Sequence, residues 1–180
     1  MEWLLSLLAA SLLLTAGCDS TEQSVARFRQ PAEQTPRRVP DQDYLDQALP
    51  KLRTVKLWLG ANELISETAR SRTEIATGMM YRTKMAENEA MIFVFPRPFR
   101  ASFYMRNTVL PLSCAYIDRD GTILEIHDMK PLDETPIVAS TDQVRYVLEV
   151  NQGWFDRHGV KIGTVVTTEK GSLDQIFFGR

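Results

Sequence analysis

The sequence predicts an α+β fold: a compact, β-rich single domain with a mainly antiparallel, barrel-like sheet and one or two short helices. Three observations lead to this prediction. Short apolar or alternating segments recur between turn signals from about residue 52 to residue 168, without a βαβ rhythm or an internal repeat. Hydrophobic residues make up 44% of the 180-residue chain and charged residues 24%. This composition supports one ordinary core and excludes wholesale disorder, collagen-like repeats and a disulfide scaffold.

The first element in the chain is a short apolar segment. Residues 3–17 carry no charge, and a membrane-spanning helix needs about 20 apolar residues, so the segment is typical of a signal-peptide core. Thr15-Ala16-Gly17-Cys18 follows and resembles a bacterial lipobox. We therefore expect residues 1–17 to be a signal peptide and Cys18 to be lipidated. The alternative is an N-terminal helix with an ordinary cysteine.

Residues 18–50 are expected to form a flexible tether behind the lipidated cysteine. Gln, Glu, Thr, Arg and Pro dominate this stretch, and such a composition cannot bury enough apolar surface to offset the entropy of ordering. The domain would then span residues 51–168, with residues 169–180 as a C-terminal tail. This organisation predicts a membrane-anchored lipoprotein of the bacterial cell envelope that faces the periplasm or the exterior.

The elements of the domain are predicted from its apolar periodicity and its turn residues. A hairpin of strands turns at Gly60-Ala61-Asn62, and Ser71 or Thr73 caps the helix that follows. Pro96 and Pro98 are expected to end the next strand. The predicted strands cover residues 55–59, 63–68, 91–95, 113–117, 122–126, 144–150 and 165–168, and the predicted helical segments cover residues 72–82 and 154–159.

Most reaction classes leave no signature in this chain. The net charge is −2 with no basic block, which gives no reason to expect a nucleic-acid partner. His127 and His158 are far apart and neither has metal-ligand spacing, so we expect neither a metal nor a cofactor. With Cys18 lipidated, Cys114 has no disulfide partner and is expected to be a small buried residue. No catalytic residue is predicted.

The densest candidate site is Phe103-Tyr104-Met105-Arg106-Asn107-Thr108. An aromatic face, a planar cation, an amide and a hydroxyl within six residues suit the recognition of a polar ligand. The alternative is structural: a strand end at which Asn107 and Thr108 cap a turn while Arg106 pairs with a nearby acid.

At these residues the chain resembles a known family of bacterial and archaeal proteins, domain of unknown function 192. The matching segments lie in order between about residues 54 and 167. Tyr104 stands where the family has Trp, Arg106 where it has Lys, Ala90 where it has Gly, and Ser113 where it has Asp. The resemblance implies a compact β-rich domain that is often exported or lipid-anchored, and it implies no established activity. The matching segments are Gly78-Met79-Met80-Tyr81-Arg82, Ala90-Met91-Ile92-Phe93-Val94-Phe95, Phe103 to Thr108, Pro111-Leu112-Ser113, Ile117-Asp118-Arg119-Asp120-Gly121, Val147-Leu148-Glu149 and Gly163.

Two functional hypotheses follow. The first is an envelope lipoprotein with a ligand-binding or accessory domain and no evident catalytic machinery, whose partner is a small polar ligand or another envelope protein. The alternative is a hydrolase of cell-wall or polysaccharide material that uses His127, beside Asp128, or a nearby acid as a general base. The residues expected to bind the ligand of the first hypothesis are Met80, Arg82, Tyr104, Arg106, Asn107 and Thr108.

Overall fold

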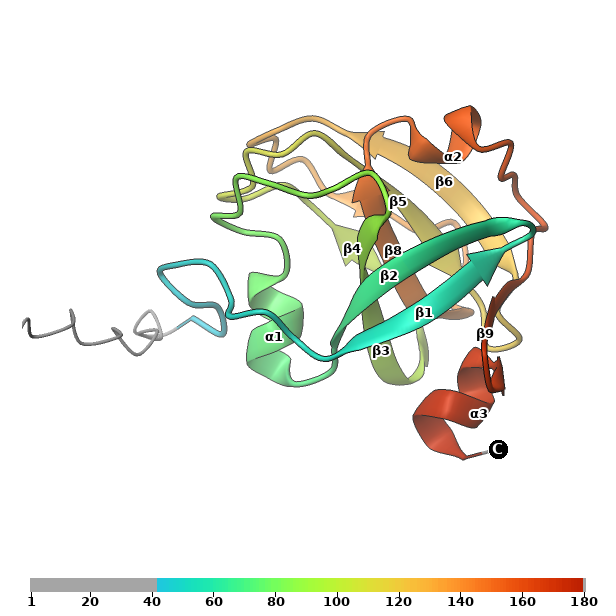
Figure 1. Ribbon diagram of the computed structural model, residues 1–180. Helices are drawn as coiled ribbons and strands as arrows, with labels where there is room; N and C mark the ends of the chain where they lie inside the picture. The colour runs from blue at the N-terminus through green and yellow to red at the C-terminus, as the bar shows by residue number, and fades with distance from the viewer. Residues whose placement is uncertain (1–41, 180) are drawn as a thin grey trace, which may run out of the picture. The chain divides into compact units, whose positions relative to one another are not determined.

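An eight-stranded sheet organises the part of the chain that the structure describes, which is residues 42–179 of a computed structural model (Figure 1). The strand order in this sheet is β10-β9-β1-β2-β3-β8-β5-β6, and β4 pairs separately with β7. The predicted signal peptide and Cys18 lie outside the described residues. The elements are β1 (Thr54–Leu59), β2 (Asn62–Ala69), α1 (Arg72–Thr77), β3 (Glu89–Phe99), β4 (Ser102–Phe103), β5 (Leu112–Ile117), β6 (Ile123–Met129), β7 (Ile137–Val138), β8 (Val144–Asn151), α2 (Trp154–Arg157), β9 (Val166–Thr168), β10 (Gly171–Ser172) and α3 (Leu173–Phe178).

The α+β class and the mainly antiparallel sheet are confirmed. Within this sheet β2 and β3 run parallel, with α1 in the connection between them, and the other neighbouring pairs are antiparallel. The sheet curls, but its two edge strands do not pair to close it into a barrel (Figure 1). At one end Thr122 bridges Val165, and the Val166 N–H donates to the Gly121 oxygen at 2.8 Å. Gly121 has φ +87°, and a Cβ there would lie 2.7 Å from that Val166 carbonyl oxygen, so this contact requires glycine.

Two predicted element ends differ from the structure by four or more residues. Strand β3 continues to Phe99 because the ladder with β8 is irregular between Val94 and Phe99, so Pro96 and Pro98 fall where their missing N–H groups interrupt no regular pairing. The helix predicted for residues 72–82 ends at Thr77. Gly78 follows it at φ +46° and donates its N–H to the Glu74 oxygen, which ends the helix. The predicted cap Ser71 is confirmed, with Glu74 completing a capping box.

Each face of the sheet has its own apolar core, because successive strand residues point to opposite sides. On one face the core includes Leu57, Ile92, Leu148 and Trp154, and Phe177 and Phe178 of α3 pack against it. The C-terminal tail therefore supplies a third short helix that the sequence analysis did not predict. The second core includes Met91, Phe93, Cys114, Tyr116 and Val147, and residues of α1 and of the loops after α1 and β4 pack into it.

The chain before β1 also contributes to the packing. Residues 42–50 belong to the predicted tether, and within this stretch Leu45 and Leu49 are buried. The Leu45 N–H donates to the Thr77 hydroxyl at 3.0 Å, which joins this segment to the end of α1. In residues 42–179 no helix combines the length and the hydrophobicity needed to span a membrane.

Candidate functional site

Three loops meet above the second core, and each contains a non-glycine residue in the left-handed backbone region. These residues are Tyr81 at φ 63°, Asn107 at φ 53° and Leu132 at φ 61°. A bulky side chain rarely adopts such a φ, and backbone strain of this kind gathers at functional sites. The loops follow α1, β4 and β6, and they span residues 78–88, 104–111 and 130–136.

Hydrogen bonds tie these strained positions to one another. The Tyr81 N–H donates to the Asn107 oxygen at 2.8 Å, and the Asn107 amide donates to the Tyr81 hydroxyl, also at 2.8 Å. The Leu132 N–H donates to the Thr108 oxygen at 3.0 Å. The three loops therefore hold one another in place, and the left-handed conformations belong to a fixed arrangement.

Beneath the first two of these loops lies a cavity of about 270 Å³. Helix α1 and strands β3, β4 and β8 supply the rest of its wall, and several of these lining residues belong to the second core. Its lining is rich in aromatic rings and thioethers, a surface that is typical of small-molecule sites. The aromatic lining residues are Phe93, Phe95, Phe99, Phe103 and Tyr104.

One acidic side chain, Glu149 of β8, also lines this cavity. Only 4% of Glu149 is exposed, and its Oε2 atom has no hydrogen-bond partner among the described residues. In the ladders it lies between Met91 of β3 and Cys114 of β5, neither of which offers a strong donor. Burial raises the pKa of Glu149 to about 8. The side chain is therefore largely protonated at neutral pH and lacks a donor for its ionised form.

Glu149 is the site residue that sequence reasoning missed. It was noted only as a member of the Val147-Leu148-Glu149 segment of the family resemblance. The sequence signal is an acid inside a mainly apolar strand pattern, and the structure adds that the neighbouring positions on both faces of β8 are buried.

The six residues predicted to bind a ligand divide into two groups. Met80, Tyr104 and Thr108 line the cavity, and Thr108 donates its hydroxyl to the Arg106 oxygen at 3.0 Å. Arg106 itself points to the surface and binds Glu134 through two nitrogens, at 2.8 and 2.6 Å, with its guanidinium 5.2 Å from the Tyr104 ring centre. The hydrogen bond to Glu134 raises the pKa of Arg106. Asn107 holds Tyr81, as described above.

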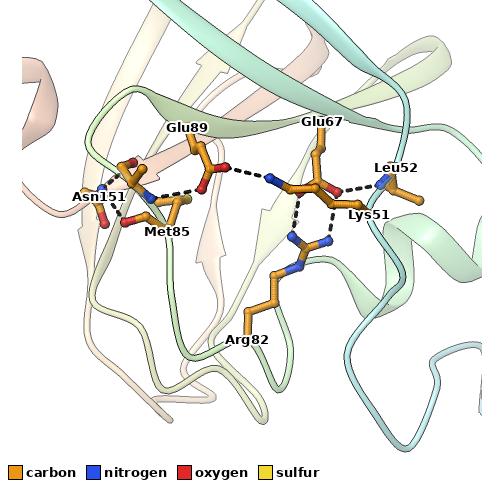
Figure 2. A network of polar contacts seen from close by, with 8 residues as sticks. Lys51, Leu52, Glu67, Arg82, Met85, Glu89 and Asn151 are labelled. Atoms are coloured by element: carbon orange, nitrogen blue, oxygen red, sulfur yellow. Dashed lines mark hydrogen bonds and ion pairs between the residues drawn. The ribbon is translucent and has the colours of Figure 1, made fainter. Parts of the chain in front are cut away.

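Arg82 is not among the residues that line the cavity, and it clamps its loop to the sheet (Figure 2). Its guanidinium binds both carboxylate oxygens of Glu67 on β2, at 2.6 and 2.9 Å. The Leu52 N–H donates to the same carboxylate at 2.7 Å, and Lys51 pairs with Glu89 at 2.7 Å nearby. This network joins the loop after α1 to β2 and to the chain that enters β1.

The proton-transfer pair suggested for the hydrolase, His127 with Asp128, does not form. The two residues are neighbours on β6 and point to opposite faces. His127 Nε2 lies 2.9 Å from Glu125 Oε2, while Asp128 accepts from the Ser113 hydroxyl. Burial by itself raises the pKa of Glu125. Hydrogen bonds from Ser140 and His127 outweigh burial and bring this pKa below its ordinary value. Glu125 lies between the Ser140 hydroxyl and the His127 imidazole, so each of them contacts the carboxylate. The direct serine–histidine hydrogen bond that activates a serine nucleophile is therefore not formed by Ser140 and His127.

A larger hollow, of about 730 Å³, lies between β1, β2 and α3. Its lining includes Arg53, Lys56, Arg70 and Lys170, which are exposed, and none of its lining residues is buried. Exposed charges on an open surface are solvated without a ligand. The cavity at Glu149 is therefore the stronger candidate.

Residues 58–168 match the sequence profile of a protein family, DUF192, which is described as "Uncharacterized ACR". A solved structure from Sinorhizobium meliloti 1021, given the provisional description of a transcription regulator, is 32% identical with a TM-score of 0.63, and the match covers 67% of this chain and 98% of that one. A protein of unknown function from Novosphingobium aromaticivorans DSM 12444 is 33% identical with a TM-score of 0.59, over 74% of this chain and 93% of that one. A comparison with curated proteins found no match.

Proposed function

The chain belongs to the DUF192 family, whose description assigns no activity, and from the geometry of its own cavity we propose that it is a small-molecule-binding protein. The observation that carries the proposal is the buried Glu149 carboxyl group, which lacks a hydrogen-bond partner among the described residues and lines an aromatic cavity. A buried polar group without a partner destabilises the fold by about 1–3 kcal/mol. A ligand that fills the cavity and contacts this carboxyl group removes that penalty.

The size of the cavity supports a ligand. An apolar cavity of about 150 Å³ holds a benzene molecule, so 270 Å³ has room for a ring with a short substituent. Its described lining contains neither a histidine nor a second carboxyl group beside Glu149. An activated nucleophile is paired with a base that is itself oriented by a third group, and the described lining offers Glu149 no such arrangement. For this reason we propose binding over turnover.

A neutral aromatic probe tests whether the cavity binds at all. In NMR titrations of the full-length chain in detergent micelles, 2-phenylethanol is expected to shift the amide signals of α1, β3 and β8 saturably at millimolar concentration. Ala76→Trp fills the cavity from α1 and abolishes the shifts, whereas Ala61→Trp, in the exposed turn between β1 and β2, leaves them unchanged. Equal shifts in both variants, or none in the wild type, would overturn the proposal.

We also propose that a lipid on Cys18 anchors the protein in the bacterial envelope. The support is the lipobox-like Thr15-Ala16-Gly17-Cys18 after an uncharged apolar segment. In a bacterial host grown with a tagged fatty acid, the wild-type chain is expected to carry the tag and Cys18→Ser to lose it. Cys114→Ala is the matched control. Cys114 is buried inside the domain, so this variant is expected to keep the label on Cys18. Label retained by Cys18→Ser would contradict the proposal.

A further inference from the structure

We propose that the ligand of this cavity is an organic cation: a primary amine on a ring-sized apolar body, with its ammonium group at Glu149. The inference rests on the proposed function, because it names the class of ligand for the same cavity. Three properties of the site carry it: the charge of the lining, the free acceptor atom and the aromatic walls.

The charge of the lining disfavours an anionic ligand. No lysine or arginine is among the residues that line the cavity in the described chain. The two arginines that the sequence predicted for the site are paired with acids, Arg106 with Glu134 at the surface and Arg82 with Glu67 on β2. A carboxylate or phosphate in this cavity would find no counter-charge in the described lining, which is costly in a buried site.

The unpartnered oxygen of Glu149 favours a ligand whose hydrogen-bond donor is positively charged. Oε2 of Glu149 is fully buried and has no hydrogen-bond partner in the described part of the protein. An alcohol would supply one neutral hydrogen bond, whereas an ammonium group supplies up to three N–H donors and the opposite charge. Hydrogen bonds between ionised partners are about twice as strong as neutral ones, and more so where water is excluded.

The aromatic walls suit the same ligand. Phe93 and Phe103 pack edge to face with ring centres 5.0 Å apart, and Phe95 lies 6.5 Å from Phe103 in a similar arrangement. The face of an aromatic ring attracts a cation, and this attraction strengthens as the site is desolvated. The apolar body of the ligand gains from the same rings and from Met80.

Binding of an amine would expel the proton of Glu149. The neutral carboxylic acid and the ammonium ion become a carboxylate–ammonium pair, and one proton leaves to solvent. Other titratable groups around Glu149 are Cys114 and Tyr116 from β5, which interact with its charge, and Tyr104, which lines the same cavity. Burial raises the pKa of Tyr116 away from neutrality. Burial raises the pKa of Cys114 further from neutrality, and Met91 on β3 and the cavity residues of α1 carry no charge.

Calorimetric titrations with three matched probes test this inference on the full-length chain. The probes are 2-phenylethylamine, 2-phenylethanol and phenylacetate, titrated at pH 7 in two buffers that differ in ionisation enthalpy. We expect the amine to bind the wild type about tenfold or more tightly than the alcohol, with release of about one proton, and phenylacetate to bind weakest. Glu149→Gln is expected to lose the preference for the amine and the proton release while it still binds the alcohol.

The outcomes separate this inference from the proposed function. If the alcohol binds the wild type as tightly as the amine, or if Glu149→Gln keeps the preference for the amine, the ligand class is wrong and the binding function stands. If none of the three probes binds, both fail. A tighter binding of phenylacetate would overturn the charge argument. The alcohol titration of Glu149→Gln also reports whether the variant is folded, so a loss of amine binding cannot be confused with unfolding.

Discussion

The Glu149→Gln variant is expected to hold its stability between pH 5 and pH 9 better than the wild type does. Burial raises the pKa of Glu149 to about 8 in the folded protein, while an unfolded chain has its ordinary value near 4.5. Below the pKa of the unfolded chain, Glu149 is protonated in both the folded and the unfolded state, and the wild type has its full stability. As the pH rises through 4.5 toward 8, the unfolded state loses its proton first, so the wild type loses stability, on the order of 5 kcal/mol in total.

Glutamine cannot ionise, and the variant therefore lacks this loss. Urea unfolding at pH 5, 7 and 9 measures the free energy of unfolding of both proteins. The free energy of the variant minus that of the wild type is expected to increase with rising pH. The exposed Glu134→Gln is the matched control, and its difference from the wild type is expected to stay flat across the same window. Parallel stability profiles for Glu149→Gln and the wild type would show that Glu149 is ionised at neutral pH, against the desolvation argument.

Local patterns predicted most of the fold because each strand and turn is specified by nearby residues. The hairpin at Gly60 and the strands around Asp118 to Gly121 combine period-two alternation with residues that tolerate a turn. The error in β3 arose because a partner far away in sequence decides where this strand ends. Pro96 and Pro98 are tolerated in β3 because the ladder with β8 is irregular there, and that partner strand follows some fifty residues later.

The candidate site was predictable only in part for the same reason. Tyr104 and Thr108 stood out because stacking and hydrogen-bonding groups were adjacent in sequence, and both line the cavity. The same pattern drew attention to Arg106, whose partner Glu134 lies in another loop. Glu149 is separated from the other polar lining residues by the whole of β5, β6 and β7. The fold brings it beneath them, and its burial is a property of the packed sheet that local spacing does not reveal.

The second large effect is expected at the clamp between Arg82 and Glu67, where Arg82→Met destabilises the protein by about 3–5 kcal/mol. Both side chains are nearly inaccessible, at 14% and 8% exposure. Removal of the guanidinium leaves the Glu67 carboxylate buried, with the Leu52 N–H as its one remaining hydrogen-bond donor within residues 42–179. Urea unfolding measures the loss, and the double variant Glu67→Gln/Arg82→Met is expected to recover part of it, because the orphaned charge is removed with its partner.

Arg106→Met is the matched control, since Arg106 also binds a glutamate through two nitrogens but does so at the surface. Its unfolding midpoint is expected to stay nearly unchanged because water replaces an exposed ion pair. The clamp also fixes the loop that carries Met80 and Tyr81, so Arg82→Met is expected to weaken binding of 2-phenylethanol although Arg82 does not line the cavity. If Arg106→Met lost as much stability as Arg82→Met, burial would not be what separates the two pairs. If Arg82→Met unfolded early but bound the probe unchanged below its transition, the loop would not depend on the clamp for its shape.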